Sequence, residues 1–140
     1  MRSLRRAEAG FYVGSPPYGF DLAPDDPSPA GYQRAARRGK WRLAPIESTL
    51  GTVRIIFERA EAGTSLTKIA ADLEAAGAAA PSGRWTRQAV HRIATNPIYT
   101  GRLVIRSSVF PELGQIFDGF VSNPPIEPER FDRVQERLRR

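Results

Sequence analysis

The chain has 140 residues and is 41% hydrophobic, which suits one small domain and is too short for most multidomain enzymes. Its net charge of +6 favours a polyanionic partner, with nucleic acid ahead of an anionic membrane. With no cysteine and one histidine, the sequence excludes disulfides, thiolate zinc sites and histidine-cluster metal sites. Carboxylate-only cation sites stay open but have no motif, so we expect no cofactor.

The basic residues are concentrated in two blocks of the sequence. Residues 31–59 hold seven basic and two acidic residues, and residues 81–106 hold five arginines and no acid. An acidic stretch, residues 60–80, separates them. Such segregation of charge favours a surface that faces a polyanion. No apolar run approaches the roughly 18 residues that a membrane span needs, and there is no secretory signal, so we expect a cytoplasmic protein without a membrane partner.

The N-terminal third is predicted to be mostly irregular. Residues 1–14 are interpreted as the end of a longer linker helix, because nothing caps a helix there. Residues 15–52 are interpreted as a Pro/Gly-rich linker and basic arm, since GSPPYG at 14–19 cannot lie inside a helix. Residues 21–31 are predicted to form a second, solvated loop that includes Asp25 and Asp26. A short turn or strand is expected at Trp41–Leu43.

Residues 53–105 are predicted to form a helix-turn-helix core. A first helix has apolar residues at i, i+3, i+4 and i+7, namely Val53, Ile56, Phe57 and Ala60. Ser48 or Thr49 is its expected N-cap, and Gly63 its end. A second helix starts at the Thr64–Ser65 cap, closes at Gly77, and repeats the spacing with Leu66, Ile69, Ala70 and Leu73. The short connection centred on Gly63 is typical of a helix-turn-helix.

The third helix of this core is the main candidate for reading DNA. Thr86 is its expected N-cap and Asn96–Pro97 its end, because the residue before proline leaves the α region. Its apolar positions, Ala89, Val90 and Ile93, leave a polar face formed by Arg87, Gln88, His91 and Arg92. Arginine grips guanine and glutamine grips adenine in the major groove, and Thr86 at the helix start suits a phosphate. Spacing and charge alone fit a solvated face equally well.

Residues 106–140 are predicted to hold a β element and a C-terminal amphipathic helix. A strand at Gly101–Arg106 is expected to pair with Val109–Phe110 or with Ile116–Val121. The final helix, residues 127–140, has an apolar stripe formed by Phe131, Val134 and Leu138. The predicted fold is therefore mainly α with a small β hairpin, and it contains a helix-turn-helix. Trp41, Phe57, Trp85 and Tyr99 are expected to pack rather than stack on bases.

Further cations are candidates for DNA phosphate contacts. These are Arg84, Lys68 beside Thr67, and a basic run formed by Arg34, Arg37, Arg38, Lys40 and Arg42, with Trp41 among them. The alternative for the run is a solvated loop. No catalytic set is recognisable: the one histidine, His91, lies in a basic helix, and there is no nucleophile elbow and no phosphate-binding glycine loop. The sequence therefore predicts a binding protein rather than an enzyme.

Four motifs in order resemble the recombinase domain of large serine recombinases, the phage integrases and transposon resolvases. They are GFYVGSPPYGF (10–20), VRIIFERAEAGTSLTKIAADL (53–73), GRWTRQAVHRIATNPIYTG (83–101) and NPPIEPERFDRVQERL (123–138). The resemblance runs from about residue 7 to 138. It implies binding to double-stranded DNA at a recombination attachment site, with the helix-turn-helix in the major groove and the linker beside the minor groove. It also implies, as partner, a catalytic serine-recombinase domain or another protomer.

The sequence departs from that family's layout in two respects. No segment resembles the catalytic serine domain, and the absence of cysteine excludes the family's zinc ribbon. The expectation is therefore DNA binding without catalysis, with the catalytic domain absent from this chain. The alternatives are a free-standing helix-turn-helix transcriptional regulator, a protein-interaction module with an incidental basic face, and a complete enzyme. The interaction module predicts no salt-dependent duplex binding.

Overall fold

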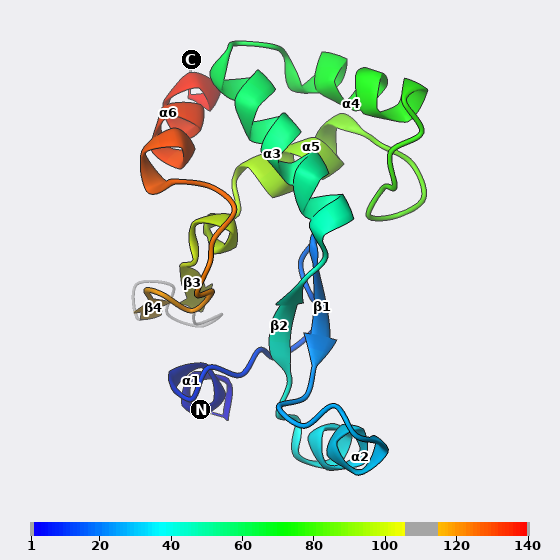
Figure 1. The fold of residues 1–140 in the computed structure, drawn as a ribbon. Coiled ribbons are helices and arrows are strands. Elements are labelled where there is room, and N and C mark those ends of the chain that lie inside the picture. The colour runs from blue at the N-terminus through cyan, green and yellow to red at the C-terminus, as the bar shows by residue number, and fades with distance from the viewer. Residues whose placement is uncertain (1, 106–114, 140) are drawn as a thin grey trace.

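The computed structural model describes residues 2–105 and 115–139 and is mainly helical, with two small hairpins. Figure 1 shows α3, α4, α5 and α6 at one end of the molecule and α1 and α2 at the other. The elements in chain order are α1 (Arg2–Glu8), β1 (Phe20–Ala23), α2 (Pro29–Arg38), β2 (Arg42–Pro45), α3 (Glu47–Glu61), α4 (Leu66–Ala75), α5 (Arg87–Ala94), the 3-10 helix η1 (Pro97–Thr100), β3 (Leu103–Ile105), β4 (Gln115–Phe117) and α6 (Pro128–Leu138). The predicted fold class is confirmed, with a second hairpin that the sequence did not indicate.

The hydrophobic core lies between the four C-terminal helices, with α3 at its centre. α3 packs against α4, α5 and α6. The apolar faces predicted for the first two helices of the core are buried. The side chains with no exposed surface include Val53, Ile56, Phe57 and Ile69. The Phe57 ring also contacts the rings of Tyr99 and Phe131, which brings η1 and α6 onto α3. Predictions from apolar spacing are therefore confirmed in this part of the chain.

The ends of the core helices follow glycine and hydroxyl signals, with one exception. Ser65 Oγ accepts from the Lys68 backbone N–H at 3.2 Å, and Gly63 and Gly77 adopt φ of +93° and +72° after α3 and α4. The expected N-cap of α3 at Ser48 or Thr49 is wrong. α3 already begins at Glu47, with Ile46 as an N-cap that makes no side-chain hydrogen bond. The chain passes from the end of β2 at Pro45 into α3 after one residue, so the helix starts before Ser48.

The three core helices are connected unequally. α3 and α4 are joined by the tight turn at residues 62–65, as predicted, whereas α5 follows α4 only after residues 76–86. α5 still packs against both α3 and α4. The candidate DNA-reading helix is therefore the third helix of a three-helix cluster. It is not the second helix of the unit joined by the Gly63 turn.

The loop predicted at residues 21–31 is wrong in part, because residues 20–23 form β1 and α2 begins at Pro29, whereas the strand expected near Trp41–Leu43 is present as β2. β1 and β2 form an antiparallel hairpin with Phe20 opposite Pro45, and α2 lies between them at the hairpin's far end (Figure 1). Ser28 Oγ caps α2 by accepting from the Gly31 N–H at 3.1 Å, Pro29 occupies its first turn, and Gly39 ends it with φ +63°. These local capping signals outweigh the loop-like proline and aspartate content.

The second hairpin links the helical core to the N-terminal end. β3 pairs antiparallel with β4, with Val104 opposite Ile116. The predicted strand at 101–106 and its partner within 116–121 are thus confirmed at slightly different bounds, while the alternative partner Val109–Phe110 lies outside the described residues. The predicted C-terminal helix is α6. In the described part of the chain, no helix has both the length and the apolar character needed to cross a membrane.

Candidate nucleic-acid interface

Helix α5 is held on the core by a cap and a buried apolar side. Thr86 Oγ1 accepts from the Ala89 N–H at 3.1 Å, so the predicted N-cap is confirmed. Val90, Ile93 and Ala94 are buried. Just before the helix, the buried Trp85 donates through Nε1 to the Ala78 carbonyl at 3.0 Å and through its backbone N–H to Glu74 at 3.1 Å. The start of α5 is therefore held by the Thr86 cap and by the hydrogen bonds of Trp85 just before it.

The polar side chains predicted for this helix all lie on its exposed face. These are Arg87, Gln88, His91 and Arg92, with Arg84 exposed in the preceding loop. Within residues 2–105 and 115–139, none of the three arginines has an acidic partner. Three unpaired guanidinium groups on and next to one short helix repel one another unless an anion approaches. This face therefore suits a polyanion better than a network of intramolecular ion pairs.

The C-terminal end of α5 leads into β3 through a compact turn. Asn96 Oδ1 accepts from the Ile98 N–H at 3.0 Å and so caps η1, which starts at Pro97. Tyr99 in η1 is only 1% exposed. The Asn96–Pro97 stop predicted from the sequence therefore redirects the chain from α5 to β3, and its tyrosine anchors the turn in the core.

Two open grooves lie at the two ends of α5. One, about 500 Å³ in volume, lies at its C-terminal end, with Arg92, Tyr12 and Leu103 among its lining residues. The other, about 330 Å³, lies at its N-terminal end, with Arg87 on one side and Arg137 of α6 on another. α5 therefore has an open groove at each end, and one of its arginines lines each groove.

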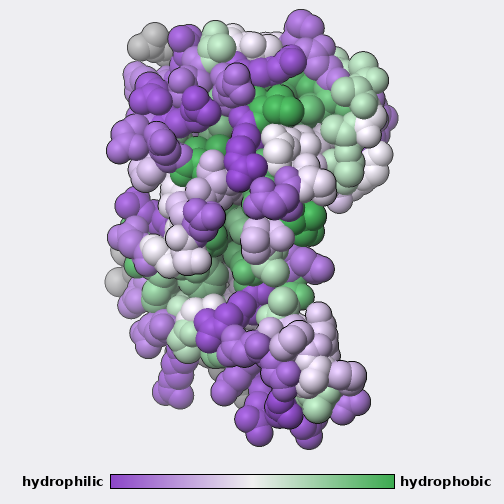
Figure 2. All heavy atoms as spheres, viewed as in Figure 1, coloured by the Kyte–Doolittle hydropathy of each residue, from purple (hydrophilic) through white to green (hydrophobic). Residues whose placement is uncertain are grey.

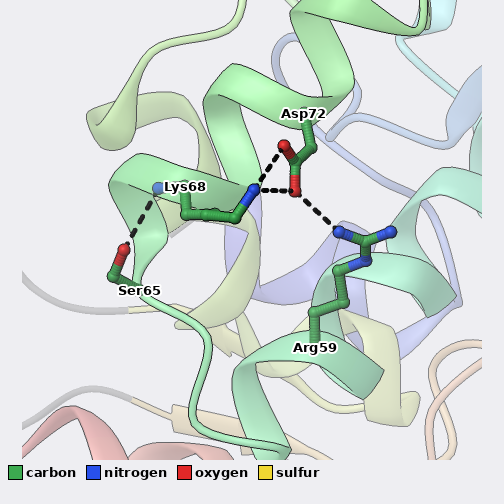
Figure 3. A network of polar contacts seen from close by, with 4 residues as sticks. All are labelled: Arg59, Ser65, Lys68 and Asp72. Atoms are coloured by element: carbon green, nitrogen blue, oxygen red, sulfur yellow. Dashed lines mark hydrogen bonds and ion pairs between the residues drawn. The ribbon is translucent and has the colours of Figure 1, made fainter.

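Lys68 on α4 is held by an ion-pair network (Figure 3). Its Nζ lies 2.9 and 3.1 Å from the two carboxylate oxygens of Asp72, and Arg59 of α3 contacts the same carboxylate at 2.8 Å. The hydrogen bond from Lys68, together with the charges of Lys68 and Arg59, holds the pKa of Asp72 below its usual value. Lys68 is therefore exposed, as predicted, but it must share its charge with Asp72 in any phosphate contact.

The basic run near α2 divides into paired and unpaired cations. Arg34 pairs with Asp26 at 2.7 Å and Arg42 pairs with Asp25, so the predicted solvated aspartates instead neutralise two arginines of the run. Arg37, Arg38 and Lys40 make no ion pair with any described residue. We call these three residues the α2 cluster. It lies at the opposite end of the molecule from α4 (Figure 1). At this α2 end, Figure 2 shows many hydrophilic side chains.

Arg6 and the Phe11 ring contact residues of the α2 cluster. Arg6 of α1 donates to the Arg38 carbonyl at 3.4 Å, and Lys40 Nζ lies 5.9 Å from the centre of the Phe11 ring. The Trp41 ring contacts the Tyr32 ring, as expected of a packing residue. The α2 cluster is therefore spatially separate from the α5 face, and the structure does not bring the two sets of predicted DNA-binding residues together.

Two features of the interface were missed in the sequence. Arg137, on the polar side of α6, shares a groove with Arg87, although 50 positions separate them in the chain. Tyr18, within the linker motif, is bound to the core: its hydroxyl donates to the Ala79 carbonyl and its ring meets Trp85 edge-on. Sequence periodicity describes one element at a time, so neither long-range contact had a local signal.

The chain is similar to known proteins in both sequence and structure. The model of the recombinase family matches residues 47–140, which is most of the chain. A crystal structure of an LSR–DNA complex superposes with a TM-score of 0.69 at 22% identity, covering 99% of this chain and 38% of that one. A second, from work on sequence requirements of the Listeria innocua prophage attP site, gives 0.67 at 22% identity, covering 99% and 50%. The chain thus spans at most half the length of these structures.

No curated protein sequence matches the chain. At 22% identity, the two superpositions establish a shared fold. The family match over residues 47–140 confirms the predicted resemblance to a recombinase domain, and no comparison supports the alternative of a free-standing transcriptional regulator.

Proposed function

The chain belongs to the recombinase family, and on that premise we propose that it binds double-stranded DNA at a recombination attachment site, as the recombinase domain of a serine site-specific recombinase. One observation carries the proposal. The exposed face of α5 presents Arg87, Gln88, His91 and Arg92 without an acidic partner among the described residues, on a helix whose other side is buried.

In the proposed complex, α5 lies in the major groove, which is about 12 Å wide and admits a single helix. Gln88 and His91 stand between the two arginines in sequence, on the exposed face. The amide of Gln88 can contact adenine bidentately, and a His91 ring nitrogen can donate to or accept from a base edge. Arg92 lines the groove beside Tyr12, and Arg84 precedes the helix cap, so both are placed to reach the flanking strands.

The remaining cations would contact DNA phosphates outside the groove read by α5. Lys68 would approach the backbone while remaining in contact with Asp72. The α2 cluster of Arg37, Arg38 and Lys40 lies at the other end of the molecule and would contact a separate stretch of duplex. Phosphate contacts of this kind set affinity and position rather than sequence preference. We therefore assign base reading to α5 alone.

We propose that strand cleavage is performed by a catalytic serine-recombinase domain, in the same polypeptide or in a partner, and that this chain contributes DNA binding. Among the described residues, the His91 side chain is exposed and makes no hydrogen bond with a carboxylate or hydroxyl that would orient it as a general base. The intact recombination complex would then bring the catalytic domain to a site selected by α5.

The test is selection of binding sites followed by a salt titration. Repeated binding to a random-sequence duplex library should enrich one sequence, and the affinity for that duplex should exceed the affinity for a scrambled duplex by roughly 10³-fold or more. Affinity for both should fall steeply as salt rises, since phosphate contacts release counterions. If the protein does not bind duplex DNA even at low salt, the proposal is rejected. Binding with no enriched sequence would reject the role of α5 in reading bases.

A further inference from the structure

The groove at the N-terminal end of α5 gathers residues from four separate elements. Arg87 enters from α5 and Arg137 from α6, while Thr64 and Thr67 come from the α3–α4 turn and the first turn of α4. The groove is open to solvent, with a volume of about 330 Å³. It therefore combines two guanidinium groups and two hydroxyls, all of which are hydrogen-bond donors.

The two arginines of this groove differ from their neighbours in having no acidic partner among the described residues. On α6, Arg130 and Arg133 both contact Glu61, at 3.2 and 3.3 Å, and Arg139 just beyond it contacts Glu136 at 3.6 Å. Arg59 at the end of α3 contacts Asp72. Arg59 and the other arginines at the C-terminal end of the chain that the structure describes thus have carboxylate partners, whereas Arg87 and Arg137 have none among the described residues.

The backbone at the α3–α4 turn accommodates Arg137 closely. Gly63 has φ +93°, and a Cβ at this position would lie 3.2 Å from Arg137 Nη1. The guanidinium group therefore rests against the turn, where a larger residue would push it aside. Arg137 is exposed and makes no ion pair with a described residue. Positioning two like charges in one groove is unfavourable unless an anion binds between them.

We propose that this groove binds one backbone phosphate of the DNA duplex, held between Arg87 and Arg137. The inference rests on the proposed DNA-binding function and adds to it a contact from α6. A helix in the major groove lies between two sugar–phosphate strands, and this groove opens at the N-terminal end of α5, beside Arg87. Guanidinium groups bind phosphate oxygens in a planar, bidentate manner, and the hydroxyls of Thr64 and Thr67 are available to donate to the same phosphate.

The assignment separates the roles of residues on α5. Arg87 contacts a phosphate at the edge of the helix, while Gln88 and His91 remain for the bases. Arg137 and Arg87 thus fix how deeply and at what angle α5 enters the groove. Both would contact the phosphate backbone and no base, so their removal should weaken binding to all duplexes alike.

The test compares Arg137→Gln with the control Arg139→Gln. The control also removes one positive charge, but Arg139 lies two residues further along the chain and is paired with Glu136. Affinity for a random-sequence duplex is measured over a range of salt concentrations. Arg137→Gln should lower the affinity on every sequence and reduce the slope of log affinity against log salt by about 1, whereas Arg139→Gln should leave the slope unchanged. Thermal unfolding of each variant checks that the fold is intact.

A double variant tests whether the two arginines share one phosphate. If they do, Arg87→Gln and Arg137→Gln together should reduce affinity by less than the product of the separate reductions, because the second loses a contact that the first has already weakened. Independent effects that multiply would reject a shared phosphate. Equal slopes for wild type, Arg137→Gln and Arg139→Gln would reject the site, while the proposed function would still stand on the binding of the wild type.

Free phosphate is distinguished from DNA by a separate titration. Inorganic phosphate is added to the wild type and to Arg137→Gln without DNA, and the side-chain N–H signals of arginine are followed by NMR. A weak, unsaturated response in both, with the altered duplex slope, supports a DNA phosphate. Saturable binding to the wild type alone, with an unaltered duplex slope, would show that the groove serves a free anion and would overturn the proposal.

Discussion

The hydroxyl of Tyr99 donates a hydrogen bond of 2.6 Å to the backbone carbonyl of Tyr18, which lies 81 positions earlier in the chain. The Tyr18 hydroxyl in turn donates to the Ala79 carbonyl, and the Tyr18 ring meets Trp85 edge-on with centroids 5.4 Å apart. Burial raises the pKa of Tyr99, so its hydroxyl remains a donor at neutral pH. The linker motif, η1 and the start of α5 are thereby joined into one unit.

Replacing Tyr99 by phenylalanine should destabilise the fold. The change removes the donor from a part-buried carbonyl and leaves that carbonyl without this partner, which costs about 1–3 kcal/mol. The free energy of unfolding, measured in urea, should fall by this amount with an unchanged denaturant slope. Tyr32→Phe is the control, since Tyr32 is 47% exposed and should change stability by less than about 0.5 kcal/mol. Similar losses in both variants would contradict this role of Tyr99.

Replacing Asp72 by asparagine should lower stability in a pH-dependent manner. Because the pKa of Asp72 is held below its usual 3.8, chiefly by the hydrogen bond from Lys68, its carboxylate stabilises the native state above that pH. This contribution is lost as the pH falls through the native pKa. The wild type and Asp72→Asn should therefore differ most in unfolding free energy at neutral pH and converge in acid.

Urea titrations at a series of pH values measure this convergence. Lys68→Gln, which lacks the main hydrogen-bond donor to Asp72, should show a smaller loss of stability on acidification than the wild type. A difference between wild type and Asp72→Asn that stays constant from neutral to acidic pH would count against the network in Figure 3 as its source.

Replacing Gln88 by alanine should reduce sequence preference rather than general affinity. If Gln88 contacts an adenine, its loss should lower the discrimination between the selected and a scrambled duplex by about 1–3 kcal/mol at one position of the site. Binding to duplexes that vary at each position measures this. Gln33→Ala, an exposed glutamine on α2, is the matched control and should leave preference unchanged. Equal weakening on both duplexes by Gln88→Ala would argue against base contact.

Neutralising the α2 cluster should weaken binding without changing sequence preference. Each phosphate contact that Arg37, Arg38 and Lys40 lose should reduce the salt slope by about 1, and therefore by up to about 3 together. The matched control is Asp26→Asn with Arg34→Gln, which removes an ion pair of α2 at no change in net charge. A salt slope that is the same in the triple variant and the wild type would place DNA away from α2.

Local signals in the sequence were sufficient for most elements of the fold. Apolar spacing identified α3, α4, α5 and α6, and Ser65, Thr86, Gly63 and Gly77 marked their ends. α2 was missed because proline and aspartate are common both in loops and at helix N-termini. The informative pair was Ser28–Pro29, an N-cap followed by a first-turn proline, and Gly39 at the other end.

The candidate interface was predictable only where it lies on one element. The exposed face of α5 follows from its own periodicity, so Arg87, Gln88, His91 and Arg92 were found together. The partners of a cation depend on the tertiary fold, and the sequence did not indicate that Asp25 and Asp26 neutralise Arg42 and Arg34. Arg87 and Arg137 line one groove, and this too depends on how α6 packs against α3.

The β1–β2 hairpin separates α2 from the helices that carry the candidate base-reading face (Figure 1). Because α2 is attached through two short strands, its length and charge can change while the packing of α3, α4 and α5 stays the same. Natural variation at this hairpin end would then alter how much duplex is covered, and substitutions on α5 would alter which sequence is chosen. The length of duplex that is covered and the base sequence that is preferred could then change independently of each other.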